Sequence, residues 1–213
     1  PLDRVEALTE AVDAVARLYG KGCDVDIRGL RHGDDVKVWK DLKVKAFETR
    51  HDEKQGSLGY VLYRKVKKRI PPYDVLDDES YFIEIKRWCD EHHQSPLDVF
   101  FALEWIPVMA YTGDCIWESI ARYEEFFIAE TLFLECTGLD ARAGTIASME
   151  SFGLMHLDTI VMNTHVFQNE RVVLSHISDR YSREQIEDIV QTRLEGTPLQ
   201  DRCSYVLCGH RYR

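Results

Sequence analysis

The sequence predicts a layered α/β fold built as one domain. Its second half alternates apolar strand-like runs with helix-like segments, and its first half is mostly short β-type runs between glycine and aspartate turns. The chain has 213 residues, 45% of them hydrophobic, which suffices for one sizeable core and is short for two. A helical bundle or an all-β sandwich fits this mixture less well.

The first half opens with an amphipathic helix over residues 2–18. Its apolar residues recur at helical spacing, and Gly20 follows where a helix would stop. The β-type runs come next and predict a small antiparallel sheet. They cover residues 23–30, 36–39, 42–47 and 57–63.

The second half begins with helical patterns over residues 78–105, broken around residues 92–96. The expected elements after them are a strand at 106–112, a short helix at 117–125 and a strand buried on both faces at 126–134. A polar loop then runs to about Gly153. The chain finishes as helix, strand, helix and strand, at residues 157–167, 172–175, 183–194 and 204–208.

The charge balance argues against a protein that binds nucleic acid over its whole surface. Lys and Arg number 27 against 37 Asp and Glu, a net charge of −10, whereas phosphate binding needs clustered cations. One local basic run does occur. It is as consistent with a flexible charged loop as with a segment that contacts phosphate. Its five cations are Arg64, Lys65, Lys67, Lys68 and Arg69.

Targeting signals are not evident in the sequence. No window approaches the roughly 18 to 20 apolar residues that cross a bilayer, and residues 1–4 do not begin like a signal peptide. The six cysteines are scattered without a C-x-x-C pair, which favours reduced thiols over a disulfide framework or a zinc knuckle. We therefore expect an intracellular protein without a membrane anchor.

Three residues of metal-ligand type follow predicted strands: His51, Asp114 and His176. Ligands in layered α/β folds collect beyond the carboxyl ends of strands, so these side chains could converge on one metal ion or phosphate. Taken singly, each also has an ordinary explanation as a turn residue or a locally hydrogen-bonded histidine.

Four short segments around these residues, in the same order, resemble tRNase Z, the 3′-tRNA-processing branch of the metallo-β-lactamase superfamily. Together they span most of residues 45–181 and are closest to short-form enzymes. They read KAFETRH followed by SLGY, then AYTGD, FLECT and VLSHISDRY.

The resemblance implies a four-layer αβ/βα sandwich, incomplete at its N-terminal side, with a projecting arm at about residues 61–95. It implies that His51, Asp114 and His176 are zinc ligands, with Asp114 bridging two zinc ions and Glu135 supporting them. The activity would be removal of 3′ trailers from precursor tRNA by a metal-activated water. The basic run would hold the tRNA elbow, and the protein would be a homodimer.

The chain also departs from the family pattern. The motif His-x-His-x-Asp-His, which supplies most of the metal ligands, is absent from this sequence, so the three residues above could hold only part of a two-zinc site. Leu154 stands where the family has its catalytic histidine, and His156 could replace it only if the backbone turned it inward. Cys115 replaces a threonine after Asp114, and a thiol there could bind a metal or oxidise.

Three functions are compatible with these observations. The first is a partial chain of a tRNase Z-like endoribonuclease. Leu154 and the absent motif favour the second, a diverged, non-catalytic binding or scaffold protein with the same fold. The third is a related hydrolase for another phosphodiester or an ester, since one fold hosts many reactions.

Overall fold

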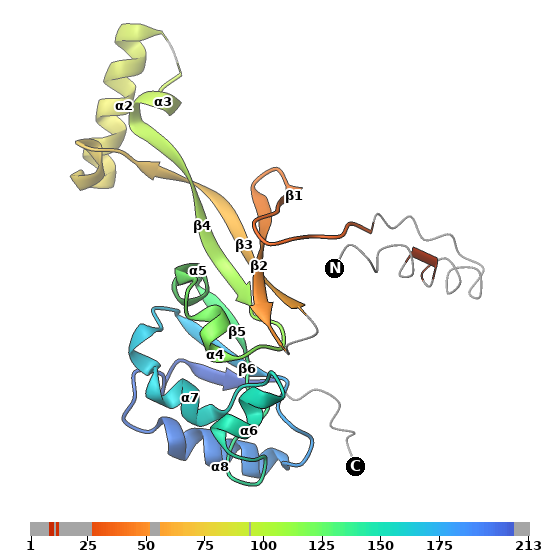
Figure 1. Ribbon diagram of the computed structural model, residues 1–213. Coiled ribbons are helices and arrows are strands. Elements are labelled where there is room, and N and C mark those ends of the chain that lie inside the picture. Colours follow the sequence, from red (N-terminus) through yellow and green to blue (C-terminus); the bar gives the residue numbers. More distant parts are fainter. Residues whose placement is uncertain (1–8, 11, 13–26, 52–55, 94, 207–213) are drawn as a thin grey trace.

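A mixed seven-stranded sheet forms the centre of the chain (Figure 1). The computed structural model describes residues 9–10, 12, 27–51, 56–93 and 95–206. The strands lie side by side in chain order, antiparallel from β1 to β4 and parallel from β4 to β7. They are β1 (Asp35–Trp39), β2 (Leu42–Arg50), β3 (Gly56–Arg69), β4 (Phe101–Tyr111), β5 (Thr131–Glu135), β6 (Arg171–Ser175) and β7 (Cys203–Tyr205).

The connections explain the change from antiparallel to parallel pairing. A tight turn joins β1 to β2, whereas each parallel strand needs a longer crossover, which here contains helices. The helices between β4 and β5 are α4 (Trp117–Ile120) and α5 (Glu124–Ile128). Those after β5 are α6 (Ile146–Ser151), α7 (Leu157–Met162) and the 3-10 turn η3 (Thr164–Val166), and α8 (Arg183–Leu194) precedes β7. The predicted α/β class is therefore confirmed.

The hydrophobic core lies on one face of the sheet. Leu132 and Leu134 of β5 and Leu174 of β6 are fully buried and pack in one cluster with apolar side chains of the crossover helices. On the other face of these strands Phe133 and Val173 are half-buried, and on β4 Met109 and Tyr111 are 42% and 44% exposed. A second sheet, as in the expected four-layer sandwich, is not among the residues that the structure describes.

A two-stranded ribbon projects from the sheet (Figure 1). It consists of the long strands β3 and β4, and carries the 3-10 turn η2 (Tyr73–Val75), helix α2 (Asp78–His92) and the short helix α3 (Leu97–Phe100) at its outer end. Tyr81 of α2 is 2% exposed and donates a hydrogen bond to the carbonyl of Phe100 over 3.0 Å. This contact fixes the helix to the ribbon. The projection includes much of the range 61–95 that was expected as an arm, and it continues through α3 into β4.

Several element boundaries differ from the sequence prediction. Residues 101–105, predicted as helix, belong to β4 because they pair with residues 65–69 of β3. Part of the predicted strand 126–134 is helix α5, and the strand begins at Thr131. A short apolar run cannot distinguish a buried helix from a buried strand, and here Phe126 and Phe127 reach the core from the helix.

The remaining differences concern the ends of the chain and the loops. The helix predicted over residues 2–18 lies outside the described residues except for residues 9, 10 and 12, and residues 27–30 of the predicted first strand have no regular structure. The loop expected before Gly153 contains α6, and α7 is shorter than predicted. No helix of the described residues is long and apolar enough to cross a membrane.

Candidate functional site

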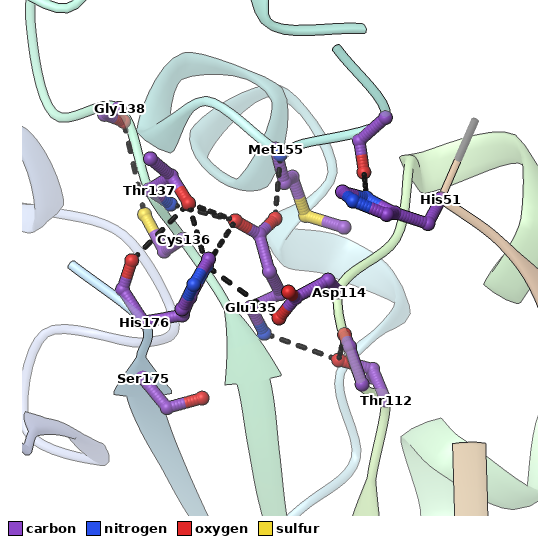
Figure 2. A network of polar contacts seen from close by, with 12 residues as sticks. His51, Thr112, Asp114, Glu135, Cys136, Thr137, Gly138, Met155, Ser175 and His176 are labelled. Atoms are coloured by element: carbon purple, nitrogen blue, oxygen red, sulfur yellow. Dashed lines mark hydrogen bonds and ion pairs between the residues drawn. The ribbon is translucent and has the colours of Figure 1, made fainter. Parts of the chain in front are cut away.

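Asp114, Glu135 and His176 meet at the carboxyl ends of three neighbouring strands (Figure 2). Glu135 is the last residue of β5, His176 directly follows β6, and Asp114 lies in the loop after β4. Because β4, β5 and β6 are parallel, their carboxyl ends share one edge of the sheet. The topology thus brings together two of the three predicted metal ligands and the predicted supporting glutamate.

The contact between Asp114 and His176 is the centre of this site. Asp114 Oδ1 lies 3.5 Å from His176 Nδ1, and the two side chains are 38% and 51% exposed, so solvent or a ligand can reach them. His176 has a φ of 60°, in the left-handed region that non-glycine residues rarely adopt. Such strained residues are concentrated at functional sites.

Glu135 is buried beneath His176. The carboxylate is 1% exposed and accepts hydrogen bonds from the Thr137 hydroxyl, from Thr137 N at 2.9 Å and from Met155 N. Its Oε1 also lies 3.7 Å from His176 Nδ1. Burial raises the pKa of Glu135, while Glu135 in turn is the main cause of the raised pKa of His176.

Thr137 links the carboxylate to the imidazole. Its hydroxyl can donate to Glu135 Oε1 or to the carbonyl oxygen of His176 at 3.1 Å, and its oxygen lies 2.9 Å from His176 Nδ1. When the hydroxyl proton points to Glu135, the Thr137 oxygen can accept from Nδ1–H, and the neutral imidazole then keeps its lone pair on Nε2. His176 can therefore offer Nε2 to a metal ion or a substrate proton.

A buried threonine and a glycine support the loop that carries Asp114. Thr112 accepts a hydrogen bond from Glu135 N over 3.1 Å and donates one to the carbonyl of Gly113. Gly113 has a φ of 65°, and a Cβ there would lie 2.9 Å from the carbonyl oxygen of Leu58. Only glycine fits this turn without strain.

His51 lies apart from the Asp114–His176 contact. Its Nδ1 is 3.0 Å from the carbonyl oxygen of Gly153. His51 and Asp114 do line the same open pocket of about 310 Å³, together with Ser57, Leu58 and Tyr111 among others. The third predicted ligand thus faces the pocket region but is held by the loop at Gly153 (Figure 2).

The described residues of the site provide fewer ligands than a complete zinc site needs. Zinc in proteins takes three or four protein ligands, and the described residues contain no group of three or more His, Cys, Asp or Glu side chains placed to hold a metal ion. Asp114 and His176 are a carboxylate and an imidazole of the right kind, and they fit part of such a site. Zinc binding therefore stays a prediction.

His156, the candidate proton donor, instead caps helix α7. Its ring is 3% exposed, and Nδ1 accepts a hydrogen bond from Asp158 N over 3.0 Å. Burial lowers the pKa of His156, which keeps the ring neutral. Among the described residues it makes no contact with Asp114 or His176. His156 thus caps α7 in this structure, and a part for it in proton transfer stays a prediction.

Burial also determines the chemical behaviour of the Cys115 thiol. It is fully buried behind Asp114, and burial raises the pKa of its thiol to about 12. The thiolate, which is the form that binds metals and oxidises, is therefore strongly disfavoured. Cys115 behaves as a small core side chain.

The basic run at residues 64–69 is part of strand β3, and not a loop. Arg64 pairs with Glu130 at 2.9 Å and Lys68 with Glu104 at 3.3 Å. Arg69 pairs with Asp78, and its guanidinium lies 4.0 Å from the centre of the Tyr81 ring. Three of the five predicted RNA-binding cations are thus engaged with acidic side chains of the chain itself.

Sequence reasoning missed the residues that organise the site. Thr137, Thr112 and Gly153 were not predicted as site residues, although Thr137 lies two residues after Glu135 in the segment FLECT. The local sequence gives no sign that the hydroxyl of Thr137 would reach across to His176. Their roles depend on contacts between separate strands and loops.

The fold and site define an α/β protein with a carboxylate–imidazole pair at the carboxyl ends of its parallel strands.

No protein-family model matches the chain. It is 28% identical over 202 residues to tRNase Z TRZ1 of Arabidopsis thaliana, a match that covers 92% of this chain and 67% of that protein. It is also 28% identical over 169 residues to the chloroplastic tRNase Z TRZ2 of the same plant, covering 78% and 44%. The chain is therefore related to the tRNase Z proteins.

Among solved structures, the chain is similar to an isothiocyanate hydrolase from Delia radicum gut bacteria. That likeness has a TM-score of 0.45 and 12% sequence identity, and it covers 93% of this chain and 63% of that one. It is too distant to add to the description of the site.

Proposed function

We propose that the chain forms part of a tRNase Z-like endoribonuclease that removes 3′ trailers from precursor tRNA. The observation that carries this proposal is the contact between Asp114 and His176 over 3.5 Å at the carboxyl ends of β4 and β6. Both residues lie in the segments that resemble tRNase Z, and the relationship to two tRNase Z proteins supports the choice of substrate.

Each residue of the site would have a distinct part in phosphodiester cleavage. Asp114 and His176 would hold zinc and the phosphate at the solvent-exposed edge of the sheet. Glu135, fixed by Thr137 and Met155 N, would keep the proton of His176 on Nδ1 so that Nε2 faces outward. Bound zinc would supply Lewis-acid polarisation and a water of lowered pKa.

The proposal needs zinc ligands in addition to Asp114 and His176. His51 would join Asp114 if its ring left the carbonyl of Gly153, from which Nδ1 is now 3.0 Å away. Further ligands would come from residues other than those described, because the pair alone is too small a donor set. The related proteins are longer than the matched region, which covers 67% and 44% of their lengths.

The projecting ribbon and the subunit arrangement complete the proposal. The ribbon would hold a distant part of the tRNA while the 3′ end lies at the site. The protein would act as a homodimer, as the resemblance to short-form enzymes suggests.

A cleavage assay with a matched control tests the proposed function. The substrate is a 3′-extended precursor tRNA, and the protein is expressed with whatever further residues its gene encodes. Asp114→Asn keeps the shape of the side chain but removes its charge, so we expect cleavage to fall about 100-fold or more and zinc content to fall with it. The control, Asp201→Asn, changes an exposed aspartate away from the site and should leave both unchanged. Unaltered cleavage by the Asp114 variant would contradict the proposal.

A non-catalytic binding protein is the second candidate. Leu154 cannot transfer a proton, and the next residue, Met155, offers Glu135 Oε2 only a backbone N–H. This candidate predicts RNA binding without cleavage and no zinc in the purified protein. A panel of other phosphodiesters and esters would reveal the third candidate, a hydrolase with a different substrate.

A further inference from the structure

Cleavage of a phosphodiester by water requires a proton for the oxygen that leaves. Leu154 stands where the related enzymes have their proton-donating histidine, and its side chain has no proton to give. His156, two residues further on, is 3% exposed at the start of α7, and among the described residues it makes no contact with Asp114. The leaving oxygen must therefore take its proton from another group at the site.

The open pocket of about 310 Å³ beside Asp114 is the place for such a group. A proton donor has to lie within hydrogen-bond reach of the leaving oxygen, and a ribose attached to a phosphate at Asp114 would extend into this pocket. Besides Asp114, its lining includes three side chains that carry an N–H or O–H group. They are His51, Ser57 and Tyr111.

Two of these three side chains are poor donors. A carbonyl oxygen can only accept a hydrogen bond, so His51 donates its Nδ1 proton to the carbonyl of Gly153 over 3.0 Å. The neutral ring then has only a lone pair on Nε2. Ser57 carries an aliphatic hydroxyl, which is as weak an acid as the ribose hydroxyl that has to be formed. Tyr111 is the remaining candidate.

A tyrosine hydroxyl has the chemistry that this step needs. A phenol has an ordinary pKa of about 10, so it keeps its proton at neutral pH and is still a much stronger acid than a ribose hydroxyl. Tyrosine is among the side chains that act as general acids in enzymes. The side chain of Tyr111 is 44% exposed, so a bound substrate can reach it.

The segment from Tyr111 to Asp114 is held firmly in the sheet edge. Tyr111 is the last residue of β4 and pairs with Tyr60 of β3 and with Phe133 of β5. Thr112 N then donates a hydrogen bond to the carbonyl of Phe133 over 3.1 Å. Three residues span at most about 11 Å, so Tyr111 and Asp114 stay close together at the pocket. The donor and the proposed zinc ligand are thus positioned by the same backbone.

We propose that Tyr111 is a catalytic residue that protonates the leaving ribose oxygen. The proposal rests on the proposed function, in which a water oxygen forms the new bond to phosphorus and gives up a proton to solvent. The P–O3′ bond breaks, and its electron pair goes to O3′. The hydroxyl proton of Tyr111 moves to O3′, and the phenolate regains a proton from water. The tRNA then ends in the 3′-hydroxyl that aminoacylation needs, and the trailer keeps the phosphate.

Two precursor tRNAs that differ in one atom test this assignment. The first is the ordinary 3′-extended precursor, and the second carries sulphur in place of O3′ at the cleavage site. A thiolate is a much weaker base than an alkoxide and leaves without a proton, so only the first precursor needs the acid. The protein is expressed with whatever further residues its gene encodes. Single-turnover rates separate bond cleavage from substrate binding and product release.

Tyr111→Phe keeps the ring and removes only the hydroxyl. We expect this variant to cleave the oxygen precursor about 100-fold more slowly, and the sulphur precursor within about threefold of the unaltered protein. Retained cleavage of the sulphur precursor also shows that the variant is folded. The control is Tyr60→Phe, the same change at the opposite residue of β3, which is not among the described residues that line the pocket. Both of its rates should stay unchanged.

The outcomes separate this inference from the proposed function. Unchanged cleavage by Tyr111→Phe would overturn the inference, and so would equal slowing of both precursors, which would make the hydroxyl a group that only positions the substrate. A loss confined to the oxygen precursor in His156→Asn would assign the proton to that histidine instead. In these cases the proposed function stands. If the unaltered protein cleaves neither precursor, the proposed function fails and this inference fails with it.

Discussion

The hydroxyl of Thr137 donates a hydrogen bond to Oε1 of Glu135, a carboxylate that is 1% exposed. The hydroxyl oxygen of Thr137 also lies 2.9 Å from His176 Nδ1. One threonine thus joins the most buried acidic group of the site to its most strained residue, whose φ is 60°. Both the stability of the sheet edge and the orientation of His176 depend on this link.

Replacing this threonine should destabilise the protein measurably. Thr137→Val keeps the shape of the side chain but leaves the buried carboxylate without one donor, so we expect the free energy of unfolding to fall by about 1–3 kcal/mol. Urea unfolding provides the measurement. Thr131→Val, the same substitution at the start of β5, serves as the control and should cost less. An equal loss in both variants would show that the hydrogen bond contributes nothing specific.

Gly153 should be intolerant of any side chain. A Cβ there would lie 1.1 Å from the carbonyl oxygen of His51, and the residue has a φ of 73°. Gly196 has a φ of 71° with nothing within 4 Å of a Cβ, so Gly196→Ala measures the backbone strain alone. We expect that control to cost about 1 kcal/mol and Gly153→Ala clearly more, by thermal or urea unfolding. Similar costs at the two positions would mean that the loop moves away from His51 freely.

Tyr181 should connect two loops of the site through its hydroxyl. The oxygen accepts hydrogen bonds from Leu139 N and Asp140 N at 3.2 and 3.3 Å and donates one to Asp140 Oδ1 at 3.1 Å. Tyr181→Phe leaves the ring in place and removes all three, so a loss of about 1–3 kcal/mol in unfolding free energy is expected. Faster amide exchange at Leu139 and Asp140 should accompany it. Tyr205→Phe on β7 is the comparison variant, and unchanged exchange in Tyr181→Phe would contradict the assigned role.

The buried imidazole of His156 should make stability depend on pH. Its pKa is lowered in the folded chain, so below the ordinary value of about 6.5 the unfolded chain binds a proton that the folded chain does not. The stability contributed by the neutral ring is present above that pH and is lost as pH falls through 6.5 toward the lowered pKa. His156→Asn keeps a residue suited to cap a helix and removes the titration.

The measurement for this prediction is the unfolding free energy at several pH values between about 7.5 and 5 for both proteins. Comparison with the Asn variant separates His156 from His176, whose raised pKa has the opposite effect on stability. We expect the unaltered protein to lose more stability than the variant as pH falls. Parallel pH profiles would show that His156 is not the titrating group.

Much of the fold follows from local pattern. Helix α8 agrees with the prediction at both ends, because Ser182 and Gln185 form a capping box and apolar residues recur at helical spacing before Leu194. The strands at residues 36–39, 42–47 and 172–175 were located correctly because they too have a local signal, a short β-type run. Where a short apolar run had no caps or breaks, as at residues 126–134, the assignment was partly wrong.

The sequence by itself determined the α/β class, the relationship to tRNase Z and the strand-end positions of Asp114, Glu135 and His176. These properties depend on composition, periodicity and short ordered segments, all of which are local. Only the tertiary structure decided that Asp114 meets His176 while His51 is held at Gly153. It also decided that Lys65 and Lys67 face away from the acidic partners of Arg64 and Lys68. Both outcomes depend on strand order, register and the alternation of side chains, which bring together residues far apart in the chain.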